Sequence, residues 1–458
     1  MTTPESPRVA VVGSGYVGTV VAASLASVGH RVVGLETDDE KLAVLRSGRA
    51  PFYETGLDEL VEAGQASDHL RFTSDASDAM ASSDVVFLCV GTPADLDGRP
   101  DMQYVEQAAR AVASASDGHH VLVTKSTVPI GSGTWLRSIL EEASSAGMRV
   151  VSNPEFLREG TAVADFLHPE RVVLGSDDPD ALDIVAEVYA PIVRPFAPRG
   201  SNGDGPTTRP PLIRTTLATA ETVKYAANAF LATKISFINE MANICELVGA
   251  DVVEVATAMG LDGRIGPRFL DAGVGWGGSC FGKDLSALAS IARDYGYEAR
   301  LLEAAIDVNQ SQRALVIEKL QRHLKILRGR RIALLGVAFK PGTDDTRDAP
   351  AIDIACRLAC HGAIVVAHDP MVRHVPDAVG LEVLDDPYAA AERADAVVLT
   401  TDWPDYLGLD LGRLASVMRG DLFLDARNMF DAAAVESAGF THDCIGRHRP
   451  VVKVFAGG

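Results

Sequence analysis

The chain has 458 residues, a length typical of two or three domains. Hydrophobic residues make up 47% of it, enough to bury ordinary globular cores, and the net charge of −20 argues against a nucleic-acid partner. The N-terminus does not have the pattern of a signal peptide, and apolar runs such as Ile332 to Phe339 are too short for a membrane span. We therefore expect no membrane partner.

Six cysteines are scattered along the chain, which is not the pattern of a disulfide framework. Cys356 and Cys360 are four residues apart but have no Cys or His pair nearby at a zinc-like spacing. We interpret both as packed helix residues, expect no metal site, and expect a reducing, cytoplasmic setting.

The first half of the chain alternates between short apolar runs and helical patterns. Arg8 to Val12 predicts a strand, Gly13 to Gly18 a turn, Thr19 to Val28 a helix and Arg31 to Leu35 a second strand. Such alternation predicts a parallel sheet covered by helices on both faces. The further strands and helices predicted here are Val85 to Val90, Met102 to Ser114, His120 to Thr124, Thr134 to Ala146, Arg149 to Val151 and Arg171 to Leu174.

The middle of the chain changes character twice. Arg194 to Thr215 is rich in Pro and Gly, which predicts a loop and a domain boundary. Leu217 to Met259 has helical periodicity and predicts one or two long helices. Asp262 to Gly282 is Gly-rich and irregular, and a helical pattern resumes from Asp284 to about Leu327.

A second α/β pattern begins at Arg331 and again opens with a strand and a Gly turn. We therefore predict an α/β protein with two Rossmann-like domains joined by a long central helical span. The predicted domains are residues 1–205, 206–325 and 326–458. The predicted elements of the last domain are Ile332 to Leu335, Ala351 to Cys360, Ile364 to Ala367, Ala396 to Thr401 and Phe423 to Leu424.

The glycine turn of the first half has the pattern of a dinucleotide-binding loop. It follows a strand, opens a helix, and is followed by Glu36 at the end of the next strand. Glycines there allow a pyrophosphate to approach the helix N-terminus, and an acidic residue accepts hydrogen bonds from the adenosine ribose and repels a 2′-phosphate. This favours NAD over NADP. The residues of the turn expected to contact NAD are Gly13, Gly15, Tyr16, Val17 and Gly18.

Two more motifs are less specific. Thr92 and Thr127 follow strands, where ligands bind in such sheets, but ordinary strand-to-helix turns explain them as well. Glu155 and Glu159 are four residues apart, so they could share a helical face and supply a general base or a ribose ligand. A solvated helix start is the alternative, and these residues alone favour it.

A long predicted helix carries Lys224 and Asn228 at positions i and i+4, hence on one face. A Lys and an Asn side by side can stabilise a developing oxyanion. The alternative, an exposed Lys on an amphipathic helix, is favoured when this pattern is considered alone.

Cys280 follows a segment in which four of the six residues from Gly273 to Gly278 are glycine. Such a run lets the backbone approach a ligand closely. A Cys at the start of the next helix would have its thiolate favoured by the helix dipole and by Lys283, and Asp284 could orient a water. The alternative is a buried Cys beside a flexible loop.

Taken together, these motifs resemble the UDP-glucose/GDP-mannose dehydrogenase family. The resemblance covers nearly the whole chain, in the family's order, and is closest to the UDP-glucose branch around Pro51 to Leu60 and Phe156 to Phe166. It rests on GSGYVG, APFYETGLDELV, KSTVPIGSG, NPEFLREGTAVADF, KYAANAFLATKISFINE, GVGWGGSCFGKD and GVAFKPGTDDTRDAP.

The resemblance implies a four-electron oxidation of the primary alcohol of UDP-glucose to a carboxylate, with two NAD per substrate and a thioester on Cys280. It implies oxyanion stabilisation by Lys224 and Asn228, assistance to water by Asp284, and acid–base steps by Glu155 with Thr127. Residues implied to border NAD are Glu36, Lys41, Thr92, Thr127, Glu159, Lys283 and Arg347. Residues implied to border the sugar nucleotide are Glu155, Phe156, Leu157, Arg158, Glu159, Lys224, Asn228, Phe269, Leu270, Asp271, Ala272, Gly273, Gly277, Phe339, Lys340 and Arg427.

The resemblance also implies a homodimer or higher homo-oligomer, with Arg264 reaching into the neighbouring subunit's site. The sequence departs from the family at Glu36, where Asp is more common, at Trp276 and Gly282, and in an extra loop from Gly200 to Pro210. Three alternatives stay open: a dehydrogenase for GDP-mannose or a UDP-N-acetylhexosamine, a non-catalytic sugar-nucleotide-binding regulator, and a single-step dehydrogenase in which Lys224 is the acid–base group and Cys280 is inert.

Overall fold

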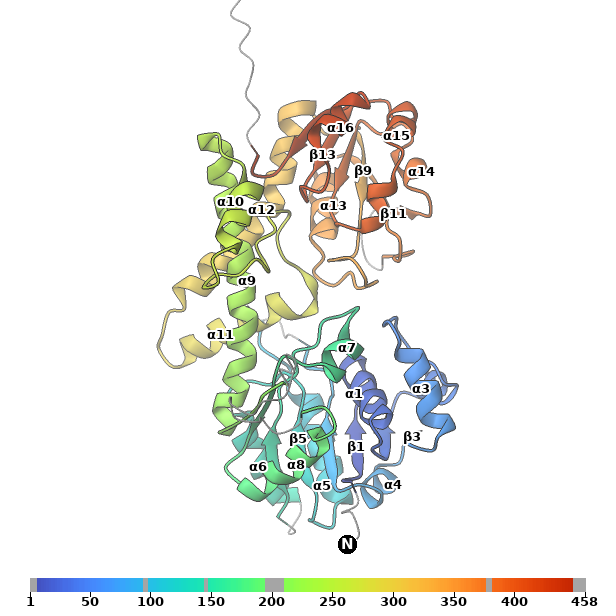
Figure 1. The fold of residues 1–458 in the computed structure, drawn as a ribbon, viewed down its shortest axis with the longest axis vertical. Coiled ribbons are helices and arrows are strands. Elements are labelled where there is room, and N and C mark those ends of the chain that lie inside the picture. The colour runs from blue at the N-terminus through green and yellow to red at the C-terminus, as the bar shows by residue number, and fades with distance from the viewer. Residues whose placement is uncertain (1–5, 94–97, 144–146, 194–209, 376–380, 448–458) are drawn as a thin grey trace, which may run out of the picture. The chain divides into compact units, whose positions relative to one another are not determined.

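The computed structural model describes residues 6–93, 98–143, 147–193, 210–375 and 381–447. Its chain divides into two compact units, residues 1–227 and 228–458 (Figure 1). Each unit contains one sheet with helices packed on both faces, which confirms the predicted α/β fold with two Rossmann-like parts.

The sheet of the first unit has the order β3-β2-β1-β4-β5-β6-β7-β8 within the described residues. All neighbouring strands are parallel except β6 and β7. The order around β1 reverses direction between β1 and β4, and ligands of such sheets bind beyond the carboxyl ends of the strands near that point. The strands are β1 (Val9–Val12), β2 (Val32–Leu35), β3 (Leu70–Thr73), β4 (Val85–Leu88), β5 (Val121–Thr124), β6 (Arg149–Ser152), β7 (Val172–Gly175) and β8 (Leu212–Thr215).

The central strands of this sheet are buried on both faces, which explains their continuous apolar runs. Val9 and Val11 of β1 pack in one core together with side chains of α1, α3, α7 and α8, whereas Ala10 and Val12 pack in the opposite core with α4, α5 and α6. The helices are α1 (Tyr16–Ser27), α2 (Asp39–Arg46), α3 (Leu57–Ala66), α4 (Ala76–Ala81), α5 (Gln103–Ala115), α6 (Ser132–Ala143), α7 (Ala162–Leu167) and α8 (Pro179–Tyr189).

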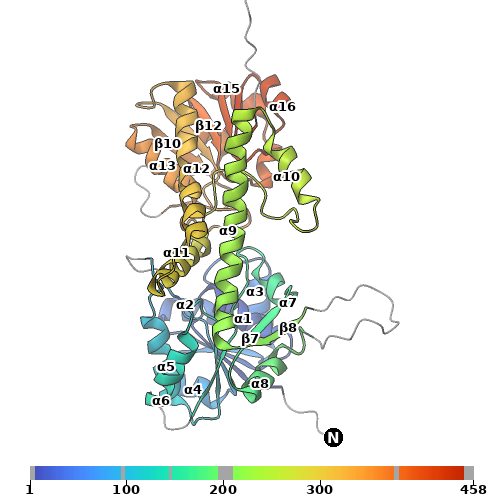
Figure 2. The ribbon, with the colours of Figure 1, turned by 90° about the vertical axis from the view of Figure 1, so that its left-hand side faces the viewer.

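The stretch predicted to form one or two long helices forms α9 (Leu217–Val248), which runs from the first unit into the second, followed by the shorter α10 (Val252–Gly260) (Figure 2). Within the second unit, α12 (Arg300–Leu324) lies alongside α9, and the hydroxyl of Ser236 donates to the carbonyl of Ala305, at 2.7 Å between oxygens. Helix α11 (Gly278–Asp294) also precedes the second sheet in the chain.

The second sheet has the order β11-β10-β9-β12-β13-β14 and is parallel throughout its described strands. It repeats the order of the first six strands of the first sheet. Its strands are β9 (Arg331–Leu335), β10 (Ile364–His368), β11 (Leu381–Leu384), β12 (Ala396–Leu399), β13 (Leu422–Asp425) and β14 (Thr441–Cys444), and its helices are α13 (Pro350–Cys360), α14 (Pro387–Ala391), η1 (Pro404–Gly408), α15 (Leu411–Val417) and α16 (Ala432–Ser437).

Two predictions about the chain's middle need correction or fall outside the description. Most of the predicted loop from Arg194 to Thr215, including nearly all of Gly200 to Pro210, lies outside the described residues. Its end, Leu212–Thr215, is not loop but the edge strand β8. Among the helices of the described residues, none is long and apolar enough to cross a membrane.

Candidate active site

The glycine turn of the first unit connects β1 directly to α1. Gly13 has φ +89°, a conformation that L side chains rarely adopt, and a Cβ on Gly18 would lie 1.8 Å from the carbonyl oxygen of Gly13. A Cβ on Gly15 would meet no atom within 4 Å, so the turn is open at its tip. Helix α1 begins at Tyr16, and its N-cap Gly15 has no side chain to cap the first amide groups. These amides and the open space fit a dinucleotide pyrophosphate.

Glu36 lies immediately after β2 and is 8% exposed. Its carboxylate accepts hydrogen bonds from the backbone amides of Ser14, Thr37 and Asp38, at 2.9 to 3.0 Å. An ionised carboxylate has about four acceptor positions, so room for one more donor is left. This suits the predicted contact with a ribose hydroxyl, and the hydrogen bond to Ser14 ties the carboxylate to the glycine turn.

Tyr16 is held by Glu54, a residue to which the sequence analysis gave no role. The buried Glu54 carboxylate accepts hydrogen bonds from the Tyr16 hydroxyl and from the backbone amides of Gly160 and Ala162. Burial and the neighbouring carboxylate raise the pKa of the Tyr16 phenol, so it stays protonated and donates. The stretch that contains Glu54 was recognised as a family motif, but only the fold brings it next to the glycine turn.

Thr92 and Thr127, which the sequence left undecided, are neighbours. The Thr92 hydroxyl donates to the Thr127 carbonyl, at 2.8 Å, so the loops after β4 and β5 are joined at the carboxyl ends of their strands. Thr127 also borders a small pocket of the first unit whose other lining residues are Ser126, Val128, Ser152, Pro154, Glu221, Lys224 and Tyr225.

Glu155 and Lys224 form a buried ion pair, with 2.7 Å between Glu155 Oε1 and Lys224 Nζ. Their side chains are 7% and 5% exposed. Burial alone would raise the pKa of the Glu155 carboxyl, but the Lys224 ammonium holds it below its ordinary value. The Lys224 ammonium also lies 5.8 Å from the centre of the Phe156 ring.

This pair corrects two readings of the isolated motifs. Residues 153–160 form no helix, and α7 begins only at Ala162, so Glu155 and Glu159 share no helical face and Glu155 is not part of a solvated helix start. Lys224 is not exposed either, because its partner, distant in the sequence, buries it. Sequence spacing within a helix cannot reveal such a partner.

Asn228 lies one helical turn after Lys224 on α9 and belongs to the second unit. Its side-chain amide donates to Asp284 Oδ2, at 2.6 Å, while the Lys283 ammonium contacts Asp284 Oδ1 at 2.7 Å. Asp284 is 1% exposed. Both oxygens of the Asp284 carboxylate therefore contact protein donors. Because Lys283 pairs with Asp284, its positive charge does not act on Cys280 alone.

Cys280 lies in the first turn of α11, which begins at Gly278, earlier than the helical pattern from Asp284 predicts. It is partly exposed, and its sulfur lies 3.5 Å from the Ser279 hydroxyl. Two other cysteines, Cys89 and Cys444, are buried, and burial raises the pKa of their thiols to about 12. A thiol at a helix N-terminus is favoured as thiolate by the helix dipole.

The glycine-rich loop before Cys280 is packed against the loops of the second sheet. A Cβ on Gly278 would lie 2.8 Å from the Phe339 ring, and one on Gly277 would lie 2.3 Å from the Asp348 carbonyl oxygen. A Cβ on Gly273 would contact Ala426 and Arg427 at 3.0 to 3.2 Å. The glycines thus allow close packing within the protein, and they bring four predicted substrate residues together: Gly273, Gly277, Phe339 and Arg427.

The other predicted site residues have varied surroundings. Leu270 and Ala272 are buried in the core of the second unit, and Phe269 has φ +65°. Several predicted residues form ion pairs with nearby acids: Lys41 with Asp38, Arg158 with Asp165, Arg264 with Asp262, Arg347 with Asp345 and Arg427 with Asp402. The remaining ones are Leu157, whose amide donates to Glu155, Lys340, whose ammonium lies 5.6 Å from the Phe339 ring centre, and the exposed Asp271.

A glycine turn open to a pyrophosphate, on a sheet of this order, defines a dinucleotide-binding protein of the dehydrogenase class. Comparison with protein families makes this specific. Residues 7–193 match the NAD binding domain of the UDP-glucose/GDP-mannose dehydrogenase family, residues 218–311 its central domain and residues 333–432 its UDP binding domain. The chain belongs to this family and is an NAD-dependent dehydrogenase.

Relatives align with almost the whole chain. It is 43% identical to UDP-glucose 6-dehydrogenase TuaD of Bacillus subtilis, over 96% of this chain and 93% of the relative. It is 44% identical to UDP-glucose 6-dehydrogenase of Rhizobium meliloti, over 96% and 99%. The solved structure of a UDP-glucose dehydrogenase from Pyrobaculum islandicum has a TM-score of 0.86 at 38% identity, covering 94% of this chain and 97% of the other.

Proposed function

We propose that the protein oxidises UDP-glucose to UDP-glucuronate with NAD. The observation that carries this proposal is the 43–44% identity, over 96% of this chain, to relatives named UDP-glucose 6-dehydrogenases. The glycine turn with Glu36 supports NAD as the cofactor. We also propose the division into an NAD domain (1–205), a central domain (206–325) and a domain for the nucleotide end of the substrate (326–458), a division that the three matched family segments favour.

The proposed chemistry proceeds through a covalent bond to Cys280. The substrate alcohol loses a proton and a hydride to become an aldehyde. The Cys280 thiolate adds to the aldehyde carbon, and the oxygen gains a proton, to give a thiohemiacetal. The thiohemiacetal loses a second hydride and its hydroxyl proton and becomes a thioester. Water cleaves the thioester to give the carboxylate and regenerate the thiol. NAD, held at the glycine turn by residues such as Gly13, Gly15 and Glu36, would supply the hydride acceptor for each of the two oxidations, so two NAD would be needed per substrate.

Each catalytic residue has a role that its surroundings support. The Lys224 ammonium, paired with Glu155, and the Asn228 amide are donors for the negative charge that develops on the substrate oxygen. Asp284, which contacts both Asn228 and Lys283, orients Asn228 and assists the attacking water. Glu155 with Thr127 serves the proton transfers of the alcohol step.

We further propose that the protein acts as a homodimer in the cytoplasm. Phe230, Phe237 and Ile244 recur every seven residues on α9, and these apolar side chains are 67%, 45% and 43% exposed within one chain. A stripe of this period is typical of a helix that packs against another helix. Its occupant is a second copy of the chain, and Arg264 then reaches the neighbouring subunit's site. Six free cysteines are consistent with a reducing compartment.

The substrate is tested with a panel of sugar nucleotides and NAD, scored by NADH absorbance. UDP-glucose should give a kcat/KM at least about tenfold above those of UDP-N-acetylhexosamines and GDP-mannose. A higher value for one of these would transfer the proposal to that substrate. NADH formation with none of them would leave the chain a sugar-nucleotide-binding protein without this activity.

The dimer is tested by light scattering of the Phe237→Asp variant. The buried charge should shift the protein toward the monomer mass, and Tyr295→Asp serves as the control because Tyr295, 85% exposed, lies outside the stripe. An unchanged dimer mass in Phe237→Asp would contradict the α9 interface.

A further inference from the structure

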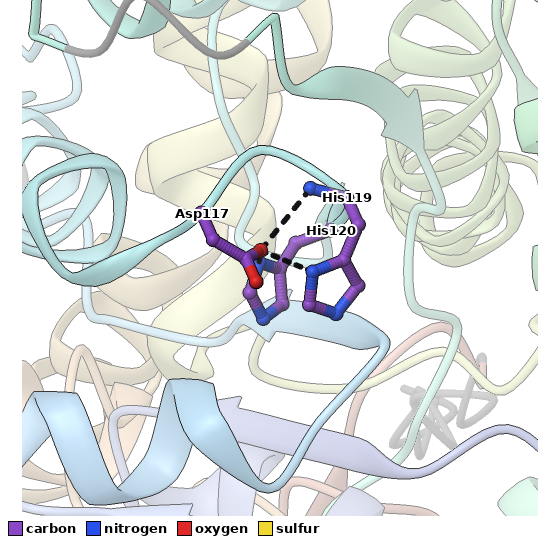
Figure 3. Close-up of side chains that lie close together, drawn as sticks. All are labelled: Asp117, His119 and His120. Atoms are coloured by element: carbon purple, nitrogen blue, oxygen red, sulfur yellow. Dashed lines mark hydrogen bonds and ion pairs between the residues drawn. The ribbon is translucent and has the colours of Figure 1, made fainter.

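Three potential metal-ligand side chains lie together in the turn between α5 and β5, outside all the residues discussed above (Figure 3). Asp117, His119 and His120 each offer one donor atom, and these atoms lie within 4.8 Å of one another. Within the described part of the chain, no other such group of Asp, Glu, His or Cys was found. Two imidazoles and a carboxylate suit borderline transition-metal ions.

Backbone carbonyls lie beside the Nε2 atoms of both imidazoles, so the Nδ1 atoms are the ones that face the turn. His120 Nε2 lies 3.0 Å from the carbonyl oxygen of Met80, and His119 Nε2 lies 3.3 Å from that of Ser83. A carbonyl only accepts, so the Nε2 of His120, which makes the closer of the two contacts, carries the proton. In the neutral ring, Nδ1 then has an unprotonated lone pair. Ligating histidines commonly have this arrangement, with the second nitrogen donating to a carbonyl.

Both Nδ1 atoms face the same carboxylate oxygen. Asp117 Oδ1 contacts His119 Nδ1 directly and lies 3.7 Å from His120 Nδ1 (Figure 3). The Ser116 hydroxyl lies 2.7 Å from His120 Nδ1, and it also accepts from the amide of Gly118, so it helps to shape the turn. The same carboxylate oxygen accepts from the backbone amide of His119, at 3.4 Å, and from His119 Nδ1 when that nitrogen carries a proton. A metal ion bound by the three side chains would replace that proton.

The electrostatic surroundings favour a cation. His120 is only 2% exposed, and the Met80 carbonyl contacts its Nε2, at 3.0 Å. Asp117 and His119 are largely exposed, so an ion can enter. The Asp84 carboxylate, paired with Arg8, lies 4.0 Å from His119 Nε2, and the chain as a whole carries a net charge of −20.

The position in the fold indicates a structural role. His120 immediately precedes β5, while Met80 and Ser83 precede β4, so the cluster lies at the amino ends of these parallel strands. The glycine turn follows the carboxyl end of β1, so it lies at the opposite end of the parallel strands of the same sheet. We propose that Asp117, His119 and His120 bind one divalent ion of the zinc, cobalt or nickel class, which fastens the turn before β5. The sequence spacing alone led us to expect no metal site.

The test uses the reduced full-length protein titrated with CoCl₂, with binding followed by calorimetry and by visible absorbance. His119→Ala and Asp117→Asn remove exposed ligands and leave the buried His120 in place. His168→Ala, an exposed histidine of the same unit, is the matched control. We expect one Co²⁺ equivalent to bind the wild type and the control, with affinity at least about tenfold lower in both ligand variants. Co²⁺ should raise the thermal midpoint only in the wild type and the control.

Thiol binding of Co²⁺ would be common to all four proteins and is removed by taking differences between them. Equal affinities and equal midpoint shifts in all four, or no binding in any, would overturn the proposal. The contact between His119 and Asp117 would then be an imidazolium–carboxylate ion pair.

Discussion

The two units have sheets with the same strand order, but the carboxylate after the second strand of each sheet has different surroundings. Glu36, after β2, accepts three backbone hydrogen bonds and keeps some exposure. Asp369, after β10, accepts from the amides of Val337, Ala338, Met371 and Val372 and from the indole of Trp403, and is fully buried. The first carboxylate can still bind a ligand, whereas the second one only holds its own loops.

The turns after the first strands differ as well. Gly13 and Gly336 both have positive φ, but α1 begins at Tyr16, directly behind its turn, whereas α13 begins only at Pro350. A helix N-terminus therefore lies at the glycine turn of the first unit alone. The intervening loop of the second unit instead carries Phe339 and packs on the loop before Cys280. Two sheets with the same topology thus need not have the same function, because the loops at the strand ends determine which ligand binds.

The largest effect is expected from a variant that removes the nucleophile of the second unit and leaves the cofactor site of the first unit unchanged. Cys280→Ser should lower turnover to the acid by at least roughly a thousandfold, because a hydroxyl is a far weaker nucleophile at neutral pH than a thiolate. NAD affinity should not change, since Gly13 to Gly18 and Glu36 belong to the other unit. Initial rates and NAD titration measure the two.

Cys356→Ser is the matched control, because Cys356 is also partly exposed but lies on α13. It should retain activity. Near-normal acid production by Cys280→Ser would mean that the thiol is structural, and the covalent mechanism would have to be abandoned.

The second effect concerns the buried ion pair of the first unit. Lys224→Met should lower kcat about a hundredfold through the lost oxyanion donor. It should also destabilise the fold, by about 3 kcal/mol, because Glu155 is left buried without its cation. The double variant Lys224→Met/Glu155→Gln should regain most of the stability but none of the activity. Recovery of activity along with stability would make the pair structural only.

A third pair of variants tests the two carboxylates directly. Asp369→Asn should destabilise the protein by about 3 kcal/mol, since an amide group would confront several backbone donors, with little effect on the KM for NAD. Glu36→Gln should cost about 1 kcal/mol but raise the KM for NAD and narrow the preference over NADP. Urea unfolding and kinetics with both cofactors measure these effects. Equal losses of stability in both variants, with no change in cofactor preference, would contradict the claim that only Glu36 contacts the cofactor.

The smallest effect compares two buried lysines. Lys319 of the second unit contacts the carboxylates of Glu246 and Asp443, at 2.7 and 3.3 Å. Lys125 of the first unit instead donates to Asn153 and Tyr189, and burial lowers its pKa from 10.5 to about 8. At pH values between these two, Lys125 is mostly protonated in the unfolded chain and mostly neutral in the folded one. Its contribution therefore makes the free energy of unfolding rise as the pH increases through that window.

Lys125→Met should therefore flatten the stability–pH curve between those values and stabilise the protein at pH 7 by about 1–2 kcal/mol. Lys319→Met should destabilise it, because two carboxylates lose their cation. Thermal unfolding across this pH range distinguishes them. An unchanged slope in Lys125→Met would mean that this lysine does not titrate in that window.

Much of the fold could be predicted from the sequence because the central strands are continuous apolar runs. The strands that escaped prediction, β3, β8, β11 and β14, lie at or near the sheet edges, where exposed polar positions interrupt the apolar pattern. The start of α11 was predicted too late because glycines mask helical periodicity.

The candidate site could be predicted only where its residues are local in sequence. The glycine turn with Glu36 follows from the spacing within one strand–helix–strand unit, and the adjacency of Lys224 and Asn228 follows from the spacing within one helix. The partners that define the chemistry do not. Glu155 reaches Lys224, and Asp284 reaches Asn228, only because the fold brings distant segments together. The resemblance to the family supplied these residues without their contacts.

The most direct measurement of the central claim is the amount of NADH formed per UDP-glucose consumed. With limiting UDP-glucose and excess NAD, absorbance gives NADH and chromatography gives the product. A covalent Cys280 route predicts two NADH and one carboxylate for each substrate molecule. One NADH with accumulation of free aldehyde would contradict it and identify a single-step dehydrogenase in which Cys280 takes no part.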